Sequence, residues 1–196
     1  MLERIGKSKL SQLMVRKDTV SIEENAIKEI VAACSEMSWS RTGALIIFER
    51  SESLNEIVKS GTTFHADVKD ELIRNIFYEG APLHDGAMII KDGCVHAAGC
   101  VLPLSPNQNL AKELGTRHRA AVGMSEKADS VSLVVSEETG SISIAIDGEL
   151  QRHLVPEQLE EILRAELLPH TEQTEEKPTL LQKMLNKFSG SKEAKK

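Results

Sequence analysis

The spacing of hydrophobic residues predicts three amphipathic helices. Residues 22–34, 67–78 and 156–167 each carry apolar side chains at intervals of three and four, which places them on one face of a helix. Ser21-Ile22-Glu23-Glu24 matches the capping-box pattern, so we expect the first helix to open at Ser21. The core-facing stripe of that helix comprises Ile22, Ala26, Ile27, Ile30, Val31, Ala33 and Cys34.

Short apolar runs bounded by turn residues predict the strands. They are residues 44–48, 86–91, 94–102, 130–136 and 141–146. Turn signals at Asp92-Gly93 and Glu138-Thr139-Gly140 favour hairpins between neighbouring runs, and Asp147-Gly148 marks a further turn. A short helical piece at 110–114 precedes another helix over 117–125. The expected fold class is therefore α/β, with a mixed central β-sheet flanked by helices.

The chain divides into three parts. Residues 1–20 are expected to be an N-terminal linker or helix. Residues 21–168 are expected to form one folded domain, and residues 169–196 a flexible tail. The tail becomes polar and acidic over 170–178 and then carries a short apolar stripe over 180–188 beside two lysines. That stripe fits a solvated nascent helix, or a segment lying on an anionic membrane surface or a partner. We expect Trp39 to pack at a helix end.

Composition narrows the function classes. Hydrophobic residues make up 40% of the 196 residues and aromatic residues 3%, so the core must rest on aliphatic side chains. The net charge of -6 argues against a protein that coats itself on nucleic acid, and no nucleic-acid partner is expected. The three cysteines show no C-x-x-C spacing and are expected to be reduced core thiols in a cytosolic environment. No apolar run reaches 18 residues and no secretory signal is present, which predicts no membrane span within this sequence.

The first cluster that could carry chemistry is Leu83-His84-Asp85-Gly86-Ala87, at the start of a predicted strand. Asp85 could accept a proton from a hydroxyl nucleophile, and Gly86 would let a ligand approach without meeting a Cβ. The alternative is a simple turn, because Asp-Gly is a common hairpin dipeptide.

The second cluster is Gly115-Thr116-Arg117-His118-Arg119, at the start of a predicted helix that Thr116 would cap. A helix N-terminus attracts anions, and arginine there has the wrong charge unless an anion offsets it. Arginine also binds phosphate through two parallel hydrogen bonds. The alternative is a surface turn in which the arginines pair with Glu113 or Glu126.

The third cluster, Ser136-Glu137-Glu138-Thr139-Gly140, ends a buried strand. It is either a polar turn or a place where a hydroxyl and a carboxylate meet a metal or a ribose. His84 and one of these glutamates would make a sparse Mg²⁺ or Mn²⁺ site completed by phosphate oxygens, and the imidazole favours Mn²⁺. The sequence contains neither a G-x-x-x-x-G-K-[ST] nor a G-x-G-x-x-G motif, so nucleotide chemistry must use a different scaffold.

Together with Leu102-Pro103-Leu104-Ser105, these clusters resemble the bacterial diadenylate cyclases, which share the DAC domain. The resemblance covers about residues 21–168, and four motifs in the same order make it specific. Within the family the chain is most similar to the membrane-anchored CdaA class, because of its Leu-Glu-Arg-Ile-Gly-Lys start and basic tail. It would then be either the cytosolic portion of an anchored protein, at the inner face of the cell membrane, or a naturally soluble member.

The resemblance implies that two ATP are condensed into cyclic di-AMP with release of two pyrophosphates, where two subunits of a homodimer meet face to face. It implies that Asp85 helps to activate the 3′-hydroxyl and that Gly86 and Ala87 let the ribose and phosphate approach. The phosphate-binding residues it implies are Gly115, Thr116, Arg117, His118 and Arg119, with Ser136 and Glu137 also at the ATP. His84 and Glu138 would hold Mn²⁺ or Mg²⁺, and Leu102 would line the adenine pocket.

One position departs from the family pattern. Some members carry an aromatic residue just before Leu-Pro-Leu, where it can stack on adenine, and here that position is Val101. Base binding would then rest on apolar contact and backbone hydrogen bonds. The alternative function is a regulatory module that binds the nucleotide without turnover, although such a module needs no general base.

Overall fold

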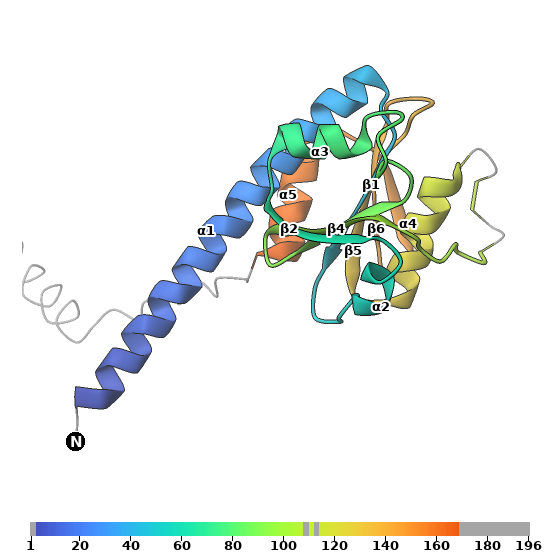
Figure 1. Ribbon diagram of the computed structural model, residues 1–196. Helices are drawn as coiled ribbons and strands as arrows, with labels where there is room; N and C mark the ends of the chain where they lie inside the picture. Colours follow the sequence, from blue (N-terminus) through green and yellow to red (C-terminus); the bar gives the residue numbers. More distant parts are fainter. Residues whose placement is uncertain (1–2, 108–109, 112–113, 169–196) are drawn as a thin grey trace, which may run out of the picture.

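A computed structural model describes residues 3–107, 110–111 and 114–168, with side chains described from residue 20 onward. In this part of the chain one seven-stranded sheet has the order β2-β4-β3-β1-β5-β6-β7 (Figure 1). β1 and β3 are parallel, whereas the other neighbouring pairs are antiparallel, so the expected mixed sheet is confirmed. The strands are β1 (Ala44–Glu49), β2 (Thr62–Asp67), β3 (Ala87–Lys91), β4 (Cys94–Cys100), β5 (Ser130–Val135), β6 (Ile142–Ile146) and β7 (Glu149–Leu154).

Helices cover both faces of the sheet. They are α1 (Glu3–Ser40), α2 (Asn55–Val58), α3 (Asp70–Phe77), α4 (Thr116–Lys127) and α5 (Pro156–Leu167). Because successive side chains of a strand point to opposite faces, β1 feeds two cores. Ile46 and Phe48 pack with α1, α3 and α5, whereas Leu45 and Ile47 pack with α2 and α4. The second core lies beside the cavity described below.

The first helix begins much earlier than the sequence predicts. α1 is 38 residues long and already helical at Glu3, so the expectation that it opens at Ser21 is wrong. Residues 3–20 contain no proline that would break a helix. The capping-box pattern at Ser21 therefore lies in the interior of α1 and does not mark its start. The predicted stripe is buried at Ala26, Ile27, Ile30, Ala33 and Cys34, but Ile22 is half exposed. α1 is not apolar enough to span a bilayer, and neither is any other helix in the described residues.

Three short elements were not predicted: α2, β2 and β7. β2 and β7 are the two edges of the sheet, and exposed and half-buried side chains alternate along both. Polar residues therefore occupy much of each strand, and its pairing with a neighbour decides its structure. α3 begins at Asp70 rather than at the predicted residue 67, because β2 continues to Asp67.

Two predictions fall wholly or partly outside the described residues. The tail over 169–196, including its apolar stripe, lies there entirely. Residues 112–113 of the predicted helical piece lie there too, and its described members Leu110, Ala111 and Leu114 are not helical. The remaining predicted helices and strands are present with bounds shifted by a few residues.

Two of the three cysteines lie in the core as expected, Cys34 and Cys100, whereas Cys94 is half-buried. Cys34, Cys94 and Cys100 are all free. Burial raises the pKa of Cys34 to about 12 and that of Cys100 to about 11, so both remain protonated and weakly nucleophilic.

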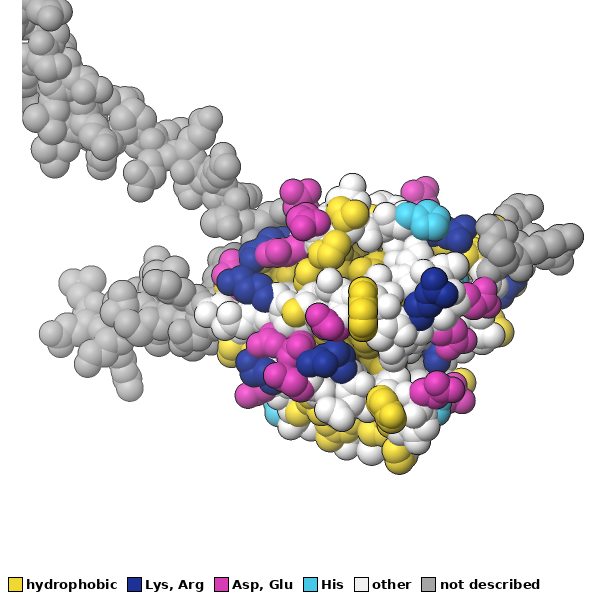
Figure 2. All heavy atoms as spheres, turned by 90° about the horizontal axis from the view of Figure 1, so that it is seen from above, with side chains coloured by type: hydrophobic (Ala, Val, Ile, Leu, Met, Phe, Trp, Pro, Cys, Tyr) yellow, Lys and Arg dark blue, Asp and Glu magenta, His cyan; other side chains and the backbone are white. Residues whose placement is uncertain are grey.

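Trp39 does not pack as expected. Its side chain is 87% exposed, because at 100° per residue it lies about 200° around α1 from the buried Met37. The view from above looks at the end of the molecule where α1 stops, and there hydrophobic side chains lie among acidic and basic ones (Figure 2). The visible charges of both signs are interspersed on this face rather than gathered into one stripe.

The last turn of α1 is fastened to the turn between β5 and β6. The Ser38 hydroxyl donates a hydrogen bond of 2.6 Å to the Gly140 carbonyl. Gly140 has a φ of +76°, and a Cβ there would lie only 2.3 Å from the Ser38 carbonyl oxygen. Only glycine allows both the positive φ and the close approach of the Ser38 carbonyl. The hydrogen bond from Ser38 then fixes the position of the β5–β6 turn relative to α1.

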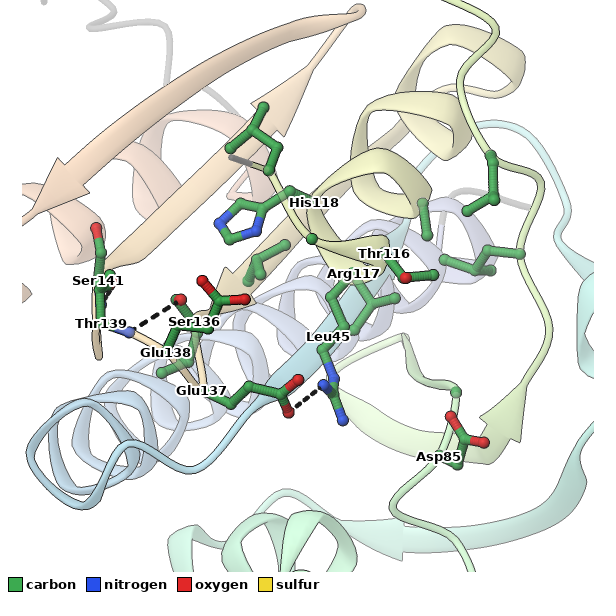
Figure 3. Close-up of a pocket in the computed structure, with 18 of the residues that line it drawn as sticks. Leu45, Asp85, Thr116, Arg117, His118, Ser136, Glu137, Glu138, Thr139 and Ser141 are labelled. Atoms are coloured by element: carbon green, nitrogen blue, oxygen red, sulfur yellow. Dashed lines mark hydrogen bonds and ion pairs between the residues drawn. The ribbon is translucent and has the colours of Figure 1, made fainter. Parts of the chain in front are cut away.

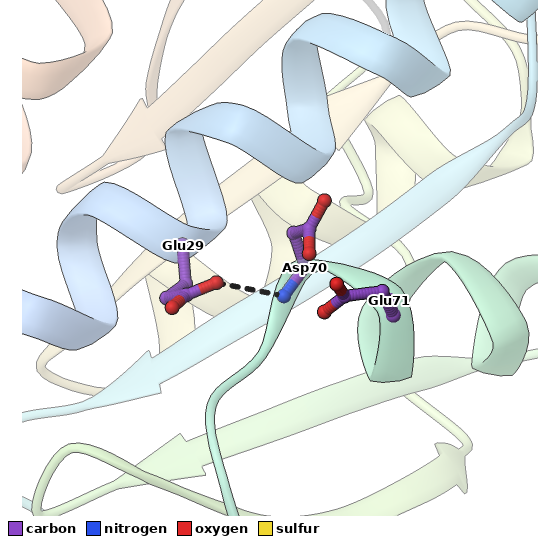
Figure 4. Close-up of side chains that lie close together, drawn as sticks. All are labelled: Glu29, Asp70 and Glu71. Atoms are coloured by element: carbon purple, nitrogen blue, oxygen red, sulfur yellow. Dashed lines mark hydrogen bonds between the residues drawn. The ribbon is translucent and has the colours of Figure 1, made fainter.

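The start of α3 is held by a carboxylate from α1. The Glu29 carboxylate accepts hydrogen bonds from the Asp70 backbone N–H at 3.1 Å and from Lys69 Nζ at 2.7 Å. The hydrogen bond from Lys69 is the main reason why the pKa of Glu29 is lowered. Glu29, Asp70 and Glu71 lie close together (Figure 4), and Asp70 also pairs with Arg74. This acidic cluster is therefore explained by helix capping and by its two basic neighbours.

A second ionic network joins β1, β5 and α5 at the far end of the sheet. Arg50 contacts Asp129 through Nε at 2.6 Å and Glu166 through Nη1 at 2.5 Å. Asp129 also accepts hydrogen bonds from the Ser51 backbone N–H and hydroxyl. The Ser51 hydroxyl is the largest cause of the lowered pKa of Asp129, followed by Arg50.

Candidate active site

A cavity of about 560 Å³ lies at the end of the sheet where β1 and β3 begin and β4 and β5 end (Figure 3). Segments that are far apart in the sequence line it. They are Leu45, Asp85–Gly86, residues 100–102 with Leu104, residues 114–118 with Ala120, residues 134–139 with Ser141, and Arg152. All four motifs that the sequence singled out therefore contribute to one site.

Asp85 and Gly86 form the part of the cavity lining next to β3. Asp85 is exposed, and in Figure 3 it lies across the cavity from the residues 136–139. Gly86 has a φ of +113°, and a Cβ there would lie 2.7 Å from the Gly99 carbonyl carbon. The glycine is thus required by the close approach of β4, a reason that differs from the expected approach of a ligand. Ala87 is fully buried in the sheet and does not line the cavity.

The N-terminus of α4 faces the cavity. Gly115 is the N-cap and no side chain caps the helix, so the expectation that Thr116 caps it is wrong: Thr116 is the first helical residue. Gly115 has an extended backbone and no side chain. The first N–H groups of the helix therefore have no side-chain hydrogen-bond partner at the N-cap. The first turn contains no acidic residue, and the whole helix start is therefore suited to an anion.

The two arginines of α4 differ in position. Arg117 lines the cavity and its Nη1 lies 2.5 Å from Glu137 Oε2 across the cavity rim. The alternative pairing with Glu126 is wrong, because Glu126 accepts a hydrogen bond from Ser105 instead, and Glu113 lies outside the described residues. Arg119 is half-buried and is not among the lining residues, so the structure does not bring it to the cavity with Arg117.

His118 is the buried member of this motif. Its side chain lines the cavity, and Nε2 lies 3.5 Å from the Ser143 hydroxyl. Burial is the main cause of its lowered pKa, and the positive charge of Arg152 acts in the same direction, whereas Glu138 opposes them. The imidazole is therefore neutral at neutral pH and can donate one hydrogen bond and accept another.

The β5–β6 turn supplies the polar lining opposite α4. The Ser136 hydroxyl accepts a hydrogen bond from the Thr139 N–H, and the Gly140 N–H donates to the Ser136 carbonyl. This tight turn leaves Glu137 and Glu138 exposed at the cavity (Figure 3).

The two expected metal ligands lie in different surroundings. Glu138 lines the cavity, whereas His84 is half-buried just outside the lining residues. His84 Nδ1 lies 2.5 Å from the Ala81 carbonyl oxygen, so Nδ1 is the donor of this hydrogen bond. A ring fixed in this way suits a metal ligand, because metal-binding histidines usually donate their other N–H to such an oxygen.

The apolar part of the lining comes from the end of β4. Leu102 is half-buried and Val101 is largely exposed, and both line the cavity. The Val101 N–H donates a 2.9 Å hydrogen bond to the Ser60 hydroxyl, which fixes the backbone at this point. Both side chains are available for apolar contact with a flat base.

Sequence reasoning missed Arg152. This residue lies on edge strand β7, pairs in register with Ser143 and lines the cavity beside His118. Because β7 itself was not predicted, none of the motifs gave a reason to bring Arg152 to the site. Residues 149–154 contain three consecutive polar residues and only two apolar ones, so no local pattern gave a signal that could have found it.

Comparison with known proteins now assigns the family. The sequence model described as "DisA bacterial checkpoint controller nucleotide-binding" matches residues 31–150, and the chain belongs to this family. The resemblance expected from the motifs is thereby confirmed.

Named relatives agree with this assignment. The chain is 45% identical over 152 residues to the cyclic di-AMP synthase CdaA of Bacillus subtilis, covering 78% of this chain and 56% of the relative. It is 42% identical over 161 residues to a diadenylate cyclase of Listeria monocytogenes, covering 82% of this chain and 58% of the relative. The chain thus spans little more than half the length of these curated relatives.

Solved structures support the fold. A crystal structure of DacA from Staphylococcus aureus, determined for a double mutant of that protein, superposes with a TM-score of 0.73 at 42% identity. The match covers 75% of this chain and 98% of that one. A hypothetical membrane-spanning protein from Bacillus cereus gives a TM-score of 0.63 at 44% identity, covering 65% of this chain and 63% of that one.

Proposed function

We propose that this chain is the catalytic domain of a diadenylate cyclase, which condenses two ATP into cyclic di-AMP and releases two pyrophosphates. One observation carries the proposal: four separate motifs meet at a single cavity of about 560 Å³. That volume is within the range of about 300–1,000 Å³ typical of small-molecule sites. The names of the relatives from Bacillus and Listeria support the same reaction.

Asp85 is the proposed general base. Its exposed carboxylate accepts the proton of a ribose 3′-hydroxyl, whose oxygen then forms a bond to the α-phosphorus of the other ATP. The bond from that phosphorus to the β-phosphate oxygen breaks, and pyrophosphate leaves with the electron pair. A second, identical step closes the ring.

The start of α4 is the proposed phosphate site. Thr116, Arg117 and the uncapped N–H groups beyond Gly115 hold the phosphates and offset the negative charge that develops on the leaving pyrophosphate. Neutral His118 and the Ser136 hydroxyl add hydrogen bonds along the same lining. Arg119, which does not line the cavity, adds positive charge behind this surface, and the buried Ala87 packs in the sheet two residues after Asp85.

The proposed cofactor is Mn²⁺ or Mg²⁺, which His84 Nε2 and Glu138 would hold together with phosphate oxygens. The ion would neutralise phosphate charge and polarise the phosphoryl group. A hard cation with few protein ligands fits a site where substrate supplies the remaining oxygens. Adenine is proposed to lie against Leu102 and Val101 without aromatic stacking.

The proposed assembly is a homodimer, because Asp85 and the phosphate it serves belong to different nucleotides. Specific activity should therefore rise with protein concentration until dimers predominate. A rate strictly proportional to enzyme across that range would contradict the two-subunit site. The similarity to the B. cereus protein, which is described as membrane-spanning, supports a membrane association of the full-length protein, and the location we propose is the inner face of the cell membrane.

The direct test is incubation of the purified chain with ATP and Mn²⁺ or Mg²⁺, with products identified by mass spectrometry. Cyclic di-AMP is the expected product, and omission of the metal should abolish it. ATP binding without product, at concentrations where the chain is dimeric, would overturn the proposed reaction in favour of a regulatory nucleotide-binding module.

A further inference from the structure

The ion pair between Arg117 and Glu137 lies directly against the backbone of Gly43. A Cβ at Gly43 would lie 2.7 Å from Glu137 Oε2 and 2.9 Å from Arg117 Nη1. Gly43 is not among the residues with positive φ, so its backbone does not require glycine. The missing side chain instead leaves the space that the ion pair fills.

This pair contributes little to the stability of the fold. The Glu137 side chain is 61% exposed and that of Arg117 is 24% exposed. Exposed ion pairs contribute roughly 0.2–1 kcal/mol. Both residues line the cavity, and in Figure 3 the guanidinium turns toward Glu137 on the β5–β6 turn. The main effect of the pair is therefore to set the position of the Arg117 guanidinium at the cavity.

We propose that Gly43 and Glu137 are positioning residues that hold the Arg117 guanidinium at the cavity lining until a nucleotide phosphate takes the place of the Glu137 carboxylate. The inference rests on the proposed function, since phosphate is the incoming ligand. It also changes the expected role of Glu137, which acts on ATP through Arg117 rather than as a direct contact.

The exchange needs little rearrangement. A carboxylate and a phosphate present similar pairs of oxygens to the arginine fork, so one can replace the other without a new side-chain arrangement. The released Glu137 is already mostly in solvent and needs little further hydration. While the carboxylate stays, however, it competes with phosphate for the same donors and adds a negative charge at the phosphate site.

Calorimetric titration with ATP tests the exchange. Glu137→Gln should bind ATP about two- to five-fold more tightly than the wild type, because a competing pair of this strength is removed. In an Arg117→Ala background the same substitution should change affinity by less than half as much. Glu161→Gln, an exposed glutamate on α5 that does not line the cavity, is the matched control and should leave affinity unchanged. Unchanged or weaker binding by Glu137→Gln overturns the inference.

Side-chain NMR tests the position of the guanidinium without any nucleotide. Gly43→Ala presses on the mobile ends of two side chains, so the fold should persist while the pair moves. The Arg117 Nε signal should shift in both Gly43→Ala and Glu137→Gln, whereas the signals of Arg74 and Arg164 should not. An unmoved Arg117 signal in both variants overturns the inference. A wild-type chain that binds no ATP would instead defeat the proposed function, and this NMR result would still decide the arginine position.

Discussion

The two ends of the central sheet each carry an arginine paired with carboxylates from distant segments, but the two arginines are held very differently. Arg50 contacts both Asp129 and Glu166, and Asp129 is further bound by Ser51. Arg117 pairs with Glu137, whose carboxylate is mostly in solvent beside a cavity. An arginine that pairs with two carboxylates from distant segments stabilises the fold. An arginine that pairs with one exposed carboxylate can exchange that carboxylate for a ligand.

The largest effect at the cavity end should follow from Asp85→Asn. Loss of the base should lower the rate of cyclic di-AMP formation by about 10²–10⁴-fold. The melting temperature and ATP affinity should change little, since the Asp85 carboxylate is exposed at the cavity. Product quantification with matched ATP binding checks this. Wild-type turnover in the variant would exclude Asp85 as the base.

At the opposite end, Asp129→Ala should affect stability and spare the site. It removes a charged acceptor from Arg50 and Ser51, which should lower the free energy of unfolding by about 1.5–3 kcal/mol. Urea denaturation measures the loss, with ATP binding at 25 °C as the control. Equal stability in the two proteins would mean that the network is dispensable.

Arg117→Ala is the counterpart at the cavity. The affinity for ATP should fall by about 1.5–3 kcal/mol, the usual range for one charged hydrogen-bond partner. The free energy of unfolding should change by at most about 1 kcal/mol, because only an exposed pair is lost. A variant that is strongly destabilised yet binds ATP normally would reverse the comparison between the two ends.

Lowering the pH should have a smaller effect, on the contribution of Asp129 to the free energy of unfolding. The pKa of Asp129 is lowered in the fold, so its contribution is fully present above its unfolded pKa and is lost as the pH falls through the folded value. Arg50 contacts this carboxylate directly and shares its guanidinium with Glu166, and Glu52 accepts a hydrogen bond from the Asp129 backbone N–H. Unfolding free energies measured from about pH 6 to about pH 2.5 should therefore decline less steeply in Asp129→Ala than in the wild type. Parallel curves would show that Asp129 does not sense this range.

The core of the molecule could be predicted from the sequence more completely than its rim. Buried strands such as β1 and β5 are mostly apolar and rich in β-branched residues or leucine, so their own composition identifies them. Edge strand β7 is polar along much of its length and exists because β6 pairs with it, which no local pattern reports.

The same division applies to the candidate site. Asp85, Arg117 and the 136–140 turn were found because chemistry-bearing residues stand next to one another in the sequence. Arg152 reaches the cavity only through sheet pairing, and Gly43 matters only because its absent side chain leaves space for the Arg117–Glu137 pair. Contacts of this kind depend on the folded arrangement of segments far apart in the chain.

The attachment of α1 to the β5–β6 turn has a mechanical consequence. The 38 helical residues at 1.5 Å each form a rod of about 57 Å, braced where α3 and α5 pack against it. Its short arm ends at Ser38, which is hydrogen-bonded to Gly140, with no flexible linker between the rod and that joint. The position of the last turn of α1 therefore sets the position of the turn that carries Ser136 and Glu137. The rod and one wall of the cavity thus share a single rigid joint.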